Sequence, residues 1–200
     1  MFSNCHCSIP TWRERTEATY KRHLQEYADR EIDVLLLGDS MFERFRTTGK
    51  CDWSQNPKIW NAGVGGDRTE HVLWRLEQGL LQHTKPKKII LMIGTNNVPF
   101  DTPKDIYDGI LSIINEIKQR SPLSKLILLA MIPRNPGVYH LADKIKTTLK
   151  EVNQKLSKLH FPDYYDFTDI FLDKTHLYSD HVHLNEAGYR VWVQQLQQIV

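Results

Sequence analysis

Residues 89–97 read Ile89-Ile90-Leu91-Met92-Ile93-Gly94-Thr95-Asn96-Asn97, an apolar run followed by glycine and three polar residues. An apolar run of this length is typical of a strand that is buried on both faces, as in a parallel sheet covered by helices. Gly94 ends the run, so the polar residues are expected at the carboxyl end of the strand. Ligands bind at that edge of a parallel sheet.

Short apolar runs alternate with longer amphipathic segments on both sides of this strand. Further strands are predicted over 34–37, 58–61, 126–129 and 164–167. Helices are predicted over 11–30, 69–78 and 103–120, through a segment that carries Ile145 to Leu159, and from near Asn185, which is a suitable N-cap. This alternation predicts an α/β fold with three α/β/α layers and a doubly wound, five-stranded parallel sheet of the flavodoxin-like type.

The length of the chain matches one domain. It has 200 residues and contains neither an internal repeat nor a linker-like stretch. We therefore expect a single domain over residues 1–200, with residues 1–30 as a helical lead-in and residues 31–200 as the catalytic core.

Composition excludes several classes of protein. The 26 basic and 24 acidic side chains give a formal charge of +2, so a nucleic-acid-binding surface is not expected. No apolar run approaches the roughly 18–20 residues of a membrane span, and the N-terminus does not resemble a secretory signal. The cysteines, Cys5, Cys7 and Cys51, are too few for a disulfide scaffold and favour a reducing, cytoplasmic location.

Polar and glycine-rich loops follow the predicted strands or precede the last helix. They contain Gly38-Asp39-Ser40, Asn61 to Asp67, Gly94 to Asn97, and Asp180 to His183. Ser40 has the position of a nucleophile between a strand and a helix, although Asp39 and Ser40 could equally serve to cap that helix. Its base would be His183, oriented by Asp180 three residues earlier; His181 competes for this role, and both histidines could also be ordinary surface residues.

Gly66 and Asn96 have the properties of oxyanion-hole donors. A glycine allows close approach of the backbone to a ligand, and an asparagine amide donates without adding charge. Either loop taken alone could instead be simple turn chemistry.

Taken together and in this order, the four loops resemble the motifs of the SGNH hydrolases, also called GDSL-type esterases. Gly65-Gly66-Asp67, His71 to Leu76 and Gly94 to Asn97 look most like the catalytic subunits of intracellular platelet-activating-factor acetylhydrolases. The resemblance implies a serine esterase that cleaves short acyl esters, chiefly acetyl esters, without a cofactor or metal. It implies Ser40 as nucleophile and oxyanion donor, Gly66 and Asn96 as the other donors, His183 as base and Asp180 as its orienting acid.

The chain departs from the family pattern at Met41, where leucine is usual, and at Arg68, where a small hydroxyl residue is common. Asp39, Arg68, Arg134 and Tyr139 are expected to line the substrate pocket. The expected partner is a small-molecule ester, and pairing of two copies as a homodimer is a further expectation. If His183 is the base, activity should fall as the pH drops through its pKa, about 6.5 when unperturbed.

Two other classes of function stay open. Asp180, His181 and His183 could hold a catalytic metal ion, in which case the chain would be a metal-dependent hydrolase. A domain of this fold could also bind an acyl or sugar ligand without turnover. The tripeptide Cys5-His6-Cys7 carries metal-ligating side chains, but a loose N-terminus is the expected interpretation.

Overall fold

A computed structural model describes residues 5–27, 30–82, 84–134 and 142–200. Its strands are β1 (Val34–Gly38), β2 (Ile59–Gly63), β3 (Lys88–Met92), β4 (Lys125–Leu129) and β5 (Asp163–Tyr165). Its α-helices are α1 (Glu14–Tyr27), α2 (Ser40–Glu43), α3 (Thr69–Glu77), α4 (Pro103–Arg120), α5 (Ala142–Leu156), α6 (Thr168–Phe171) and α7 (Glu186–Ile199). Short 3₁₀ helices are η1 (His6–Ser8), η2 (Arg44–Arg46) and η4 (Thr175–Leu177).

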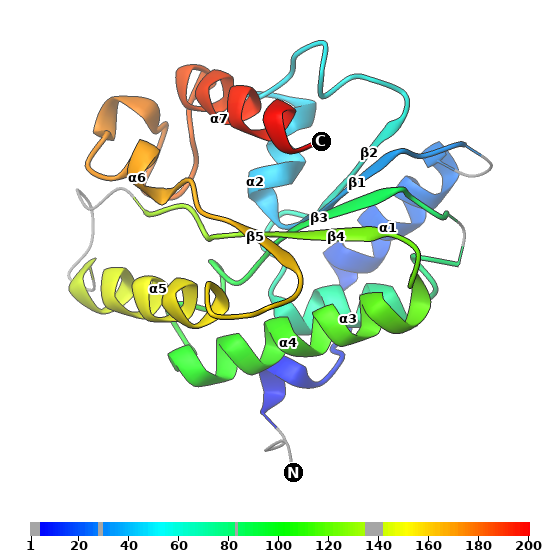
Figure 1. Cartoon of the computed structure of the whole chain (residues 1–200), viewed down its shortest axis with the longest axis horizontal. Helices are drawn as coiled ribbons and strands as arrows, with labels where there is room; N and C mark the ends of the chain where they lie inside the picture. Colours follow the sequence, from blue (N-terminus) through cyan, green and yellow to red (C-terminus); the bar gives the residue numbers. More distant parts are fainter. Residues whose placement is uncertain (1–4, 28–29, 83, 135–141) are drawn as a thin grey trace.

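The sheet is parallel throughout, with the strand order β2-β1-β3-β4-β5. Helices α1, α3, α4 and α5 cover one face, and α2 and α7 cover the other (Figure 1). The predicted three-layer, doubly wound fold with five parallel strands is therefore confirmed. The chain reverses its direction of winding between β1 and β3, which places the ligand crevice at the carboxyl ends of these strands.

Burial on both faces explains why the strands are apolar at almost every position. Leu35 and Leu37 of β1 pack in the cluster beneath α3 and α4, whereas Val34 and Leu36 pack in the cluster beneath α7. Successive side chains of a strand point to opposite faces, so each face needs its own apolar residues.

The boundaries differ from prediction where side chains bond to the local backbone. The strand predicted over 164–167 is β5, which ends at Tyr165. Asp166 Oδ1 accepts a hydrogen bond from the backbone N–H of Thr168 at 2.9 Å, and this turn leads directly into α6, which was not predicted. The predicted cap of the last helix is confirmed, because Asn185 Oδ1 accepts from the N–H of Gly188 at 3.0 Å.

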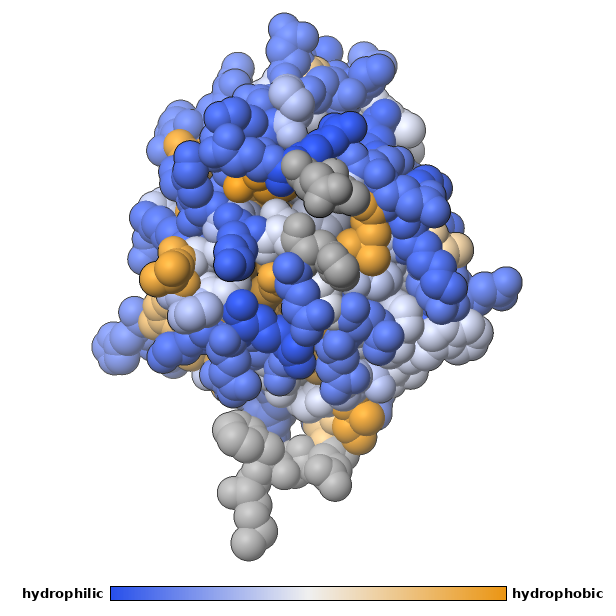
Figure 2. Space-filling model, turned by 90° about the vertical axis from the view of Figure 1, so that its right-hand side faces the viewer, coloured by the Kyte–Doolittle hydropathy of each residue, from blue (hydrophilic) through white to orange (hydrophobic). Residues whose placement is uncertain are grey.

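The two ends of the sheet differ in character. Figure 2 shows the face at the amino ends of the strands, where hydrophilic residues prevail and hydrophobic residues form small, separate spots. The loops with unusual sequences all lie at the opposite, carboxyl end. Among the described residues, no helix is both long enough and apolar enough to cross a membrane.

Candidate active site

Ser40 lies at the first position of α2, immediately beyond the end of β1. Asp39 caps this helix, since its carboxylate accepts from the backbone N–H of Met41 at 2.9 Å. The chain turns sharply here because Gly38 has no side chain: a Cβ at this position would lie 2.1 Å from the carbonyl oxygen of Met92. The turn brings the Ser40 side chain to the crevice, where the residue is 9% exposed.

A continuous chain of hydrogen bonds joins Ser40, His183 and Asp180. Ser40 Oγ lies 2.8 Å from His183 Nε2, and His183 Nδ1 lies 2.8 Å from Asp180 Oδ2. The second oxygen of Asp180 accepts from the backbone N–H groups of Val182 and His183, both at 2.7 Å. The turn before α7 therefore holds Asp180 and His183 together, while Ser40 comes from the start of α2, more than 140 residues earlier in the chain.

The surroundings of His183 and Asp180 favour a neutral imidazole beside an ionised carboxylate. Partial burial opposes ionisation of Asp180, but the hydrogen bonds from His183 and Val182 outweigh it and hold the pKa of Asp180 at about 2. Burial lowers the pKa of His183 below its ordinary value, against the opposing effect of Asp180. Arg44, 3.6 Å from Asp180 Oδ2, adds a positive charge that favours the same states. A neutral His183 can accept a proton from Ser40.

The loops that follow β2 and β3 carry hydrogen-bond donors at the same edge of the sheet as Ser40. Gly66 adopts φ of +77°, a conformation that glycine tolerates best. Asn96 Nδ2 donates one N–H to the carbonyl of Asp67 at 2.9 Å, which leaves its second N–H available. Within the described part of the chain, the backbone N–H groups of Ser40 and Gly66 have no acceptor. These are the donors that an oxyanion hole requires.

Arg13, from the segment before α1, holds the Gly65-Gly66 loop from outside. Its two terminal nitrogens donate to the carbonyl oxygens of Gly66 at 2.6 Å and Gly65 at 2.9 Å. A carbonyl and the next N–H belong to one rigid peptide plane, so this grip also restricts where the neighbouring N–H groups point. Sequence reasoning missed this contact because it links residues more than 50 positions apart.

Arg75 connects the ends of β1 and β2 with the loop that carries Asp67. The residue is fully buried, pairs with Asp67 at 3.0 Å, and donates to the carbonyls of Ala62 at 2.6 Å and Gly38 at 3.1 Å. The other oxygen of Asp67 accepts from Thr16 Oγ1 at 2.6 Å. A signal for Arg75 was present in the sequence: it lies three residues after Val72, within the apolar stripe of α3, where an unpaired charge would be costly.

The residues expected to line the substrate pocket have different environments. Asp39 is buried, and burial raises the pKa of its carboxyl to about 7. The guanidinium of Arg68 lies 4.9 Å from the centre of the Phe100 ring and 3.6 Å from Glu70 Oε1. Arg134 donates to the side chain of Thr95 at 3.2 Å and to the Thr95 carbonyl. Tyr139 lies outside the described residues.

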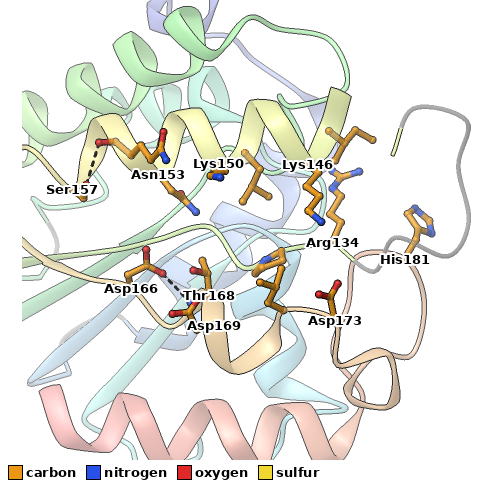
Figure 3. Close-up of a pocket in the computed structure, with 15 residues that line it drawn as sticks. Arg134, Lys146, Lys150, Asn153, Ser157, Asp166, Thr168, Asp169, Asp173 and His181 are labelled. Carbon is orange, nitrogen blue, oxygen red and sulfur yellow. Dashed lines mark hydrogen bonds between the residues drawn. The ribbon is translucent and has the colours of Figure 1, made fainter. Parts of the chain in front are cut away.

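A cavity of about 420 Å³ extends from Arg134 and His181 between α5 and the segment that carries α6. In Figure 3, Lys146 and Lys150 come from α5, and Asp169 and Asp173 lie across the cavity from them. The apolar part of the lining consists of Pro133, Ile145, Leu149 and Leu172. Because Arg134 also contacts Thr95, the residue before Asn96, the cavity begins beside the loop that carries Asn96.

A second, much smaller hollow, of about 10 Å³, lies beside the turn that carries Asp39 and Met41. Its lining also includes Thr95 and Val182. Ser40, Asn96 and His183 are not among the described residues that line it.

His181 and His183 occupy separate environments. Both ring nitrogens of His183 contact protein groups, Ser40 and Asp180, whereas His181 borders the large cavity. The contacts of His183 with Ser40 and Asp180 are those expected of a triad base.

The chain is similar to known proteins over most of its length. A model of the GDSL-like Lipase/Acylhydrolase family matches residues 36–191. Platelet-activating factor acetylhydrolase IB subunit alpha2 from Homo sapiens is 31% identical over 202 residues, which cover 94% of this chain and 84% of the relative. Subunit alpha1 from Bos taurus is 31% identical over 185 residues, covering 88% of this chain and 78% of the relative.

Solved structures share the fold. A member of the lipolytic protein G-D-S-L family from Veillonella parvula superposes with a TM-score of 0.71 at 19% identity, covering 84% of this chain and 97% of that one. The acetyl xylan esterase AlAXEase gives a TM-score of 0.65 at 20% identity, covering 84% of this chain and all (100%) of that one.

Proposed function

The chain belongs to the GDSL-like lipase/acylhydrolase family, and we propose that this carboxylic ester hydrolase is a serine esterase that releases short acyl groups through an acyl-enzyme. The observation that carries the proposal is the chain of two 2.8 Å hydrogen bonds from Ser40 through His183 to Asp180. Such a chain raises the reactivity of a serine hydroxyl because the base accepts its proton as the new bond forms.

The reaction proceeds in two halves. Ser40 Oγ attacks the ester carbonyl while His183 Nε2 accepts the hydroxyl proton, and the same proton then passes to the departing alcohol. The negative oxygen of the tetrahedral intermediate accepts hydrogen bonds from the N–H groups of Ser40 and Gly66 and from Asn96 Nδ2. A water molecule, deprotonated by His183, then attacks the acyl-serine, and the acid leaves as Ser40 regains its proton.

The large cavity supports a large alcohol portion of the ester. The cavity of about 420 Å³ has room for an alcohol with both apolar and charged parts. The relatives named acetylhydrolases support acetyl as the acyl group. We therefore favour an acetyl ester of an amphipathic alcohol.

The experiment is hydrolysis of p-nitrophenyl acetate, butyrate and octanoate by the wild type and by Ser40→Ala, each with and without a chelator. We expect turnover that is fastest with acetate, is unaffected by the chelator, and falls to background in Ser40→Ala. Ser112→Ala, on α4 and outside the lining of the large cavity, is the matched control and should retain wild-type turnover.

The other outcomes would redirect the assignment. Turnover that survives Ser40→Ala but stops with the chelator would favour the metal-dependent hydrolase with His181 and His183. Absence of turnover on all three esters would favour a binding module.

Because burial lowers the pKa of His183, the rate of hydrolysis should begin to fall only below pH 6.5, the ordinary pKa of histidine.

Three broader expectations also belong to this proposal. Residues 31–200 form the catalytic core and residues 1–30 the lead-in, which contributes Arg13 to the Gly65-Gly66 loop. A cytoplasmic location and a homodimer stay predictions.

A further inference from the structure

The tripeptide Cys5-His6-Cys7 is packed against the domain, which corrects the expectation of a loose N-terminus for these residues. Cys7 is fully buried, and its carbonyl accepts from Thr69 Oγ1 at 2.9 Å. Gly109 of α4 makes the close approach feasible, because a Cβ there would lie 2.7 Å from the Cys7 carbonyl. The tripeptide therefore has a defined place between α3 and α4.

The three side chains converge. The ligand atoms of Cys5, His6 and Cys7 all lie within 4.8 Å of one another, and Cys7 Sγ is 3.7 Å from His6 Nε2. In a tetrahedral zinc site, a thiolate sulfur and an imidazole nitrogen lie about 2.3 and 2.05 Å from the metal and hence about 3.6 Å from each other. Cys7 Sγ and His6 Nε2, at 3.7 Å, already have nearly this separation.

Carboxylates on the inner side of the cluster supply negative charge. Asp101 Oδ1 lies 2.9 Å from His6 Nε2, and the Asp101 side chain is 4% exposed. The amide of Asn97 donates to both Asp101 and the buried carboxylate of Glu70, at 2.9 and 3.1 Å, so these two acids lie close together. Glu70 already pairs with Arg68 at 3.6 Å, whereas among the described residues the only ion-pair partner of Asp101 is His6. A cation beside His6 would therefore stabilise the buried Asp101 carboxylate.

We propose that Cys5, His6, Cys7 and Asp101 bind one zinc ion. Two sulfurs, one imidazole and one carboxylate form a donor set that suits zinc in four-coordinate geometry, whereas magnesium and calcium prefer oxygen ligands. Burial raises the pKa of both thiols, and binding therefore releases two thiol protons to solvent. The ion enters from the side of His6, whose side chain is 60% exposed.

This site is separate from the proposed esterase chemistry. The ion would tie η1 to Asp101, beyond β3, and thereby stabilise the packing of the N-terminal segment on α3 and α4. Neither Ser40 nor His183 contacts these residues, so zinc binding and ester hydrolysis can be tested independently.

The experiment uses the full chain without a histidine tag, reduced, stripped of metal by a chelator and then freed of the chelator. Titration with Co²⁺ should produce a thiolate-to-cobalt charge-transfer band and intense visible d–d bands that saturate at one ion per chain. Competing Zn²⁺ should bleach both sets of bands, and Zn²⁺ should raise the thermal midpoint of the metal-free protein.

Variants identify the ligands. Cys7→Ser should abolish the charge-transfer band, and Asp101→Asn should weaken Co²⁺ binding by about 10- to 100-fold. His6→Ala removes an exposed ligand with little risk to folding and should also weaken binding. The control is Cys51→Ser, since the third cysteine lies outside the cluster.

Three results would overturn the proposal: no saturable Co²⁺ spectrum in the reduced wild type, an unchanged affinity in His6→Ala, or loss of the charge-transfer band in Cys51→Ser. Circular dichroism of Cys7→Ser separates loss of the ligand from loss of the fold.

Discussion

The carboxyl edge of the sheet has two halves that differ in how their side chains are held. In the half formed by β2, β1 and β3, each reactive group has a specific partner: Ser40 contacts His183, Asn96 contacts Asp67, and the loops between them are held by Arg75. In the half formed by β4 and β5, a wide cavity lies between lysines of α5 and aspartates near α6. In the proposed mechanism, bonds are made and broken in the first half, and the second half accommodates a large group.

This difference leads to an expectation about mutations. Changes in the first half should lower kcat for every ester, because they alter groups that act in the transition state. Changes in the second half should alter the preference among esters and leave the reaction on a small ester intact.

The largest effect is expected for Asp180→Asn. The asparagine amide would donate to His183 Nδ1, so the proton would move to Nε2 and the ring would no longer accept from Ser40. We expect kcat to fall by about 10,000-fold, the order of magnitude typical of this change in serine triads. Steady-state kinetics on p-nitrophenyl acetate measure it. Glu186→Gln, in which the side chain is 78% exposed, is the control, and a loss below tenfold in Asp180→Asn would remove Asp180 from the triad.

A smaller effect is expected for Asn96→Ala, which removes one donor to the oxyanion. The loss in kcat should be roughly 100- to 1,000-fold, with little change in KM, because the interaction strengthens only as charge develops on the carbonyl oxygen. A proportional rise in KM with unchanged kcat would instead assign Asn96 to substrate binding.

Arg13→Ala tests whether the grip on the Gly65-Gly66 loop positions its N–H groups. We expect kcat to fall about 10- to 100-fold, which is less than the loss of a donor itself, because the donors remain but are less well oriented. Arg13→Lys should recover only part of the rate, since an ammonium group lacks the planar fork that reaches both carbonyls. Arg22→Ala, on the exposed side of α1, is the control. Unchanged kcat in Arg13→Ala, or an equal loss in Arg22→Ala, would contradict a positioning role.

The smallest effect is expected in the cavity half. Leu172→Ala removes apolar surface from the cavity lining at a residue that is 42% exposed, so folding should be little affected. The ratio of kcat/KM for hexyl acetate to kcat/KM for ethyl acetate should fall by about two- to tenfold. The kcat/KM for p-nitrophenyl acetate should stay unchanged. Leu123→Ala, which is 98% exposed and lies outside the cavity lining, is the control. An unchanged ratio would mean that the alcohol does not use this cavity.

Sequence patterns predicted the fold well because burial on both faces leaves a strong mark on each strand, as in Ile89 to Ile93. They also predicted that the loops after β1, β2 and β3 lie together, since parallel strands bring those loops to one edge. The helix α6 was missed, because it is only four residues long and follows a turn at Asp166.

The parts of the site that sequence reasoning missed depend on contacts between distant segments. Arg13, in a charged segment, gives no local sign that it will reach Gly65 and Gly66. Cys7 likewise belongs to a short N-terminal segment, and only its packing against Gly109 of α4 shows that it is buried. Local patterns report what an element buries, whereas these residues act through pairings that the tertiary fold creates.

The central claim is that Ser40 is the nucleophile, and its most direct test is intact-mass measurement of the chain after reaction with a fluorophosphonate. Attack by Ser40 Oγ on phosphorus displaces fluoride and leaves one phosphonyl group on the protein. We predict a single adduct on the peptide that contains Ser40, absent from Ser40→Ala and formed far more slowly in His183→Ala. An adduct that persists in Ser40→Ala, or an enzyme that hydrolyses esters at full rate after treatment without any adduct, would contradict the assignment.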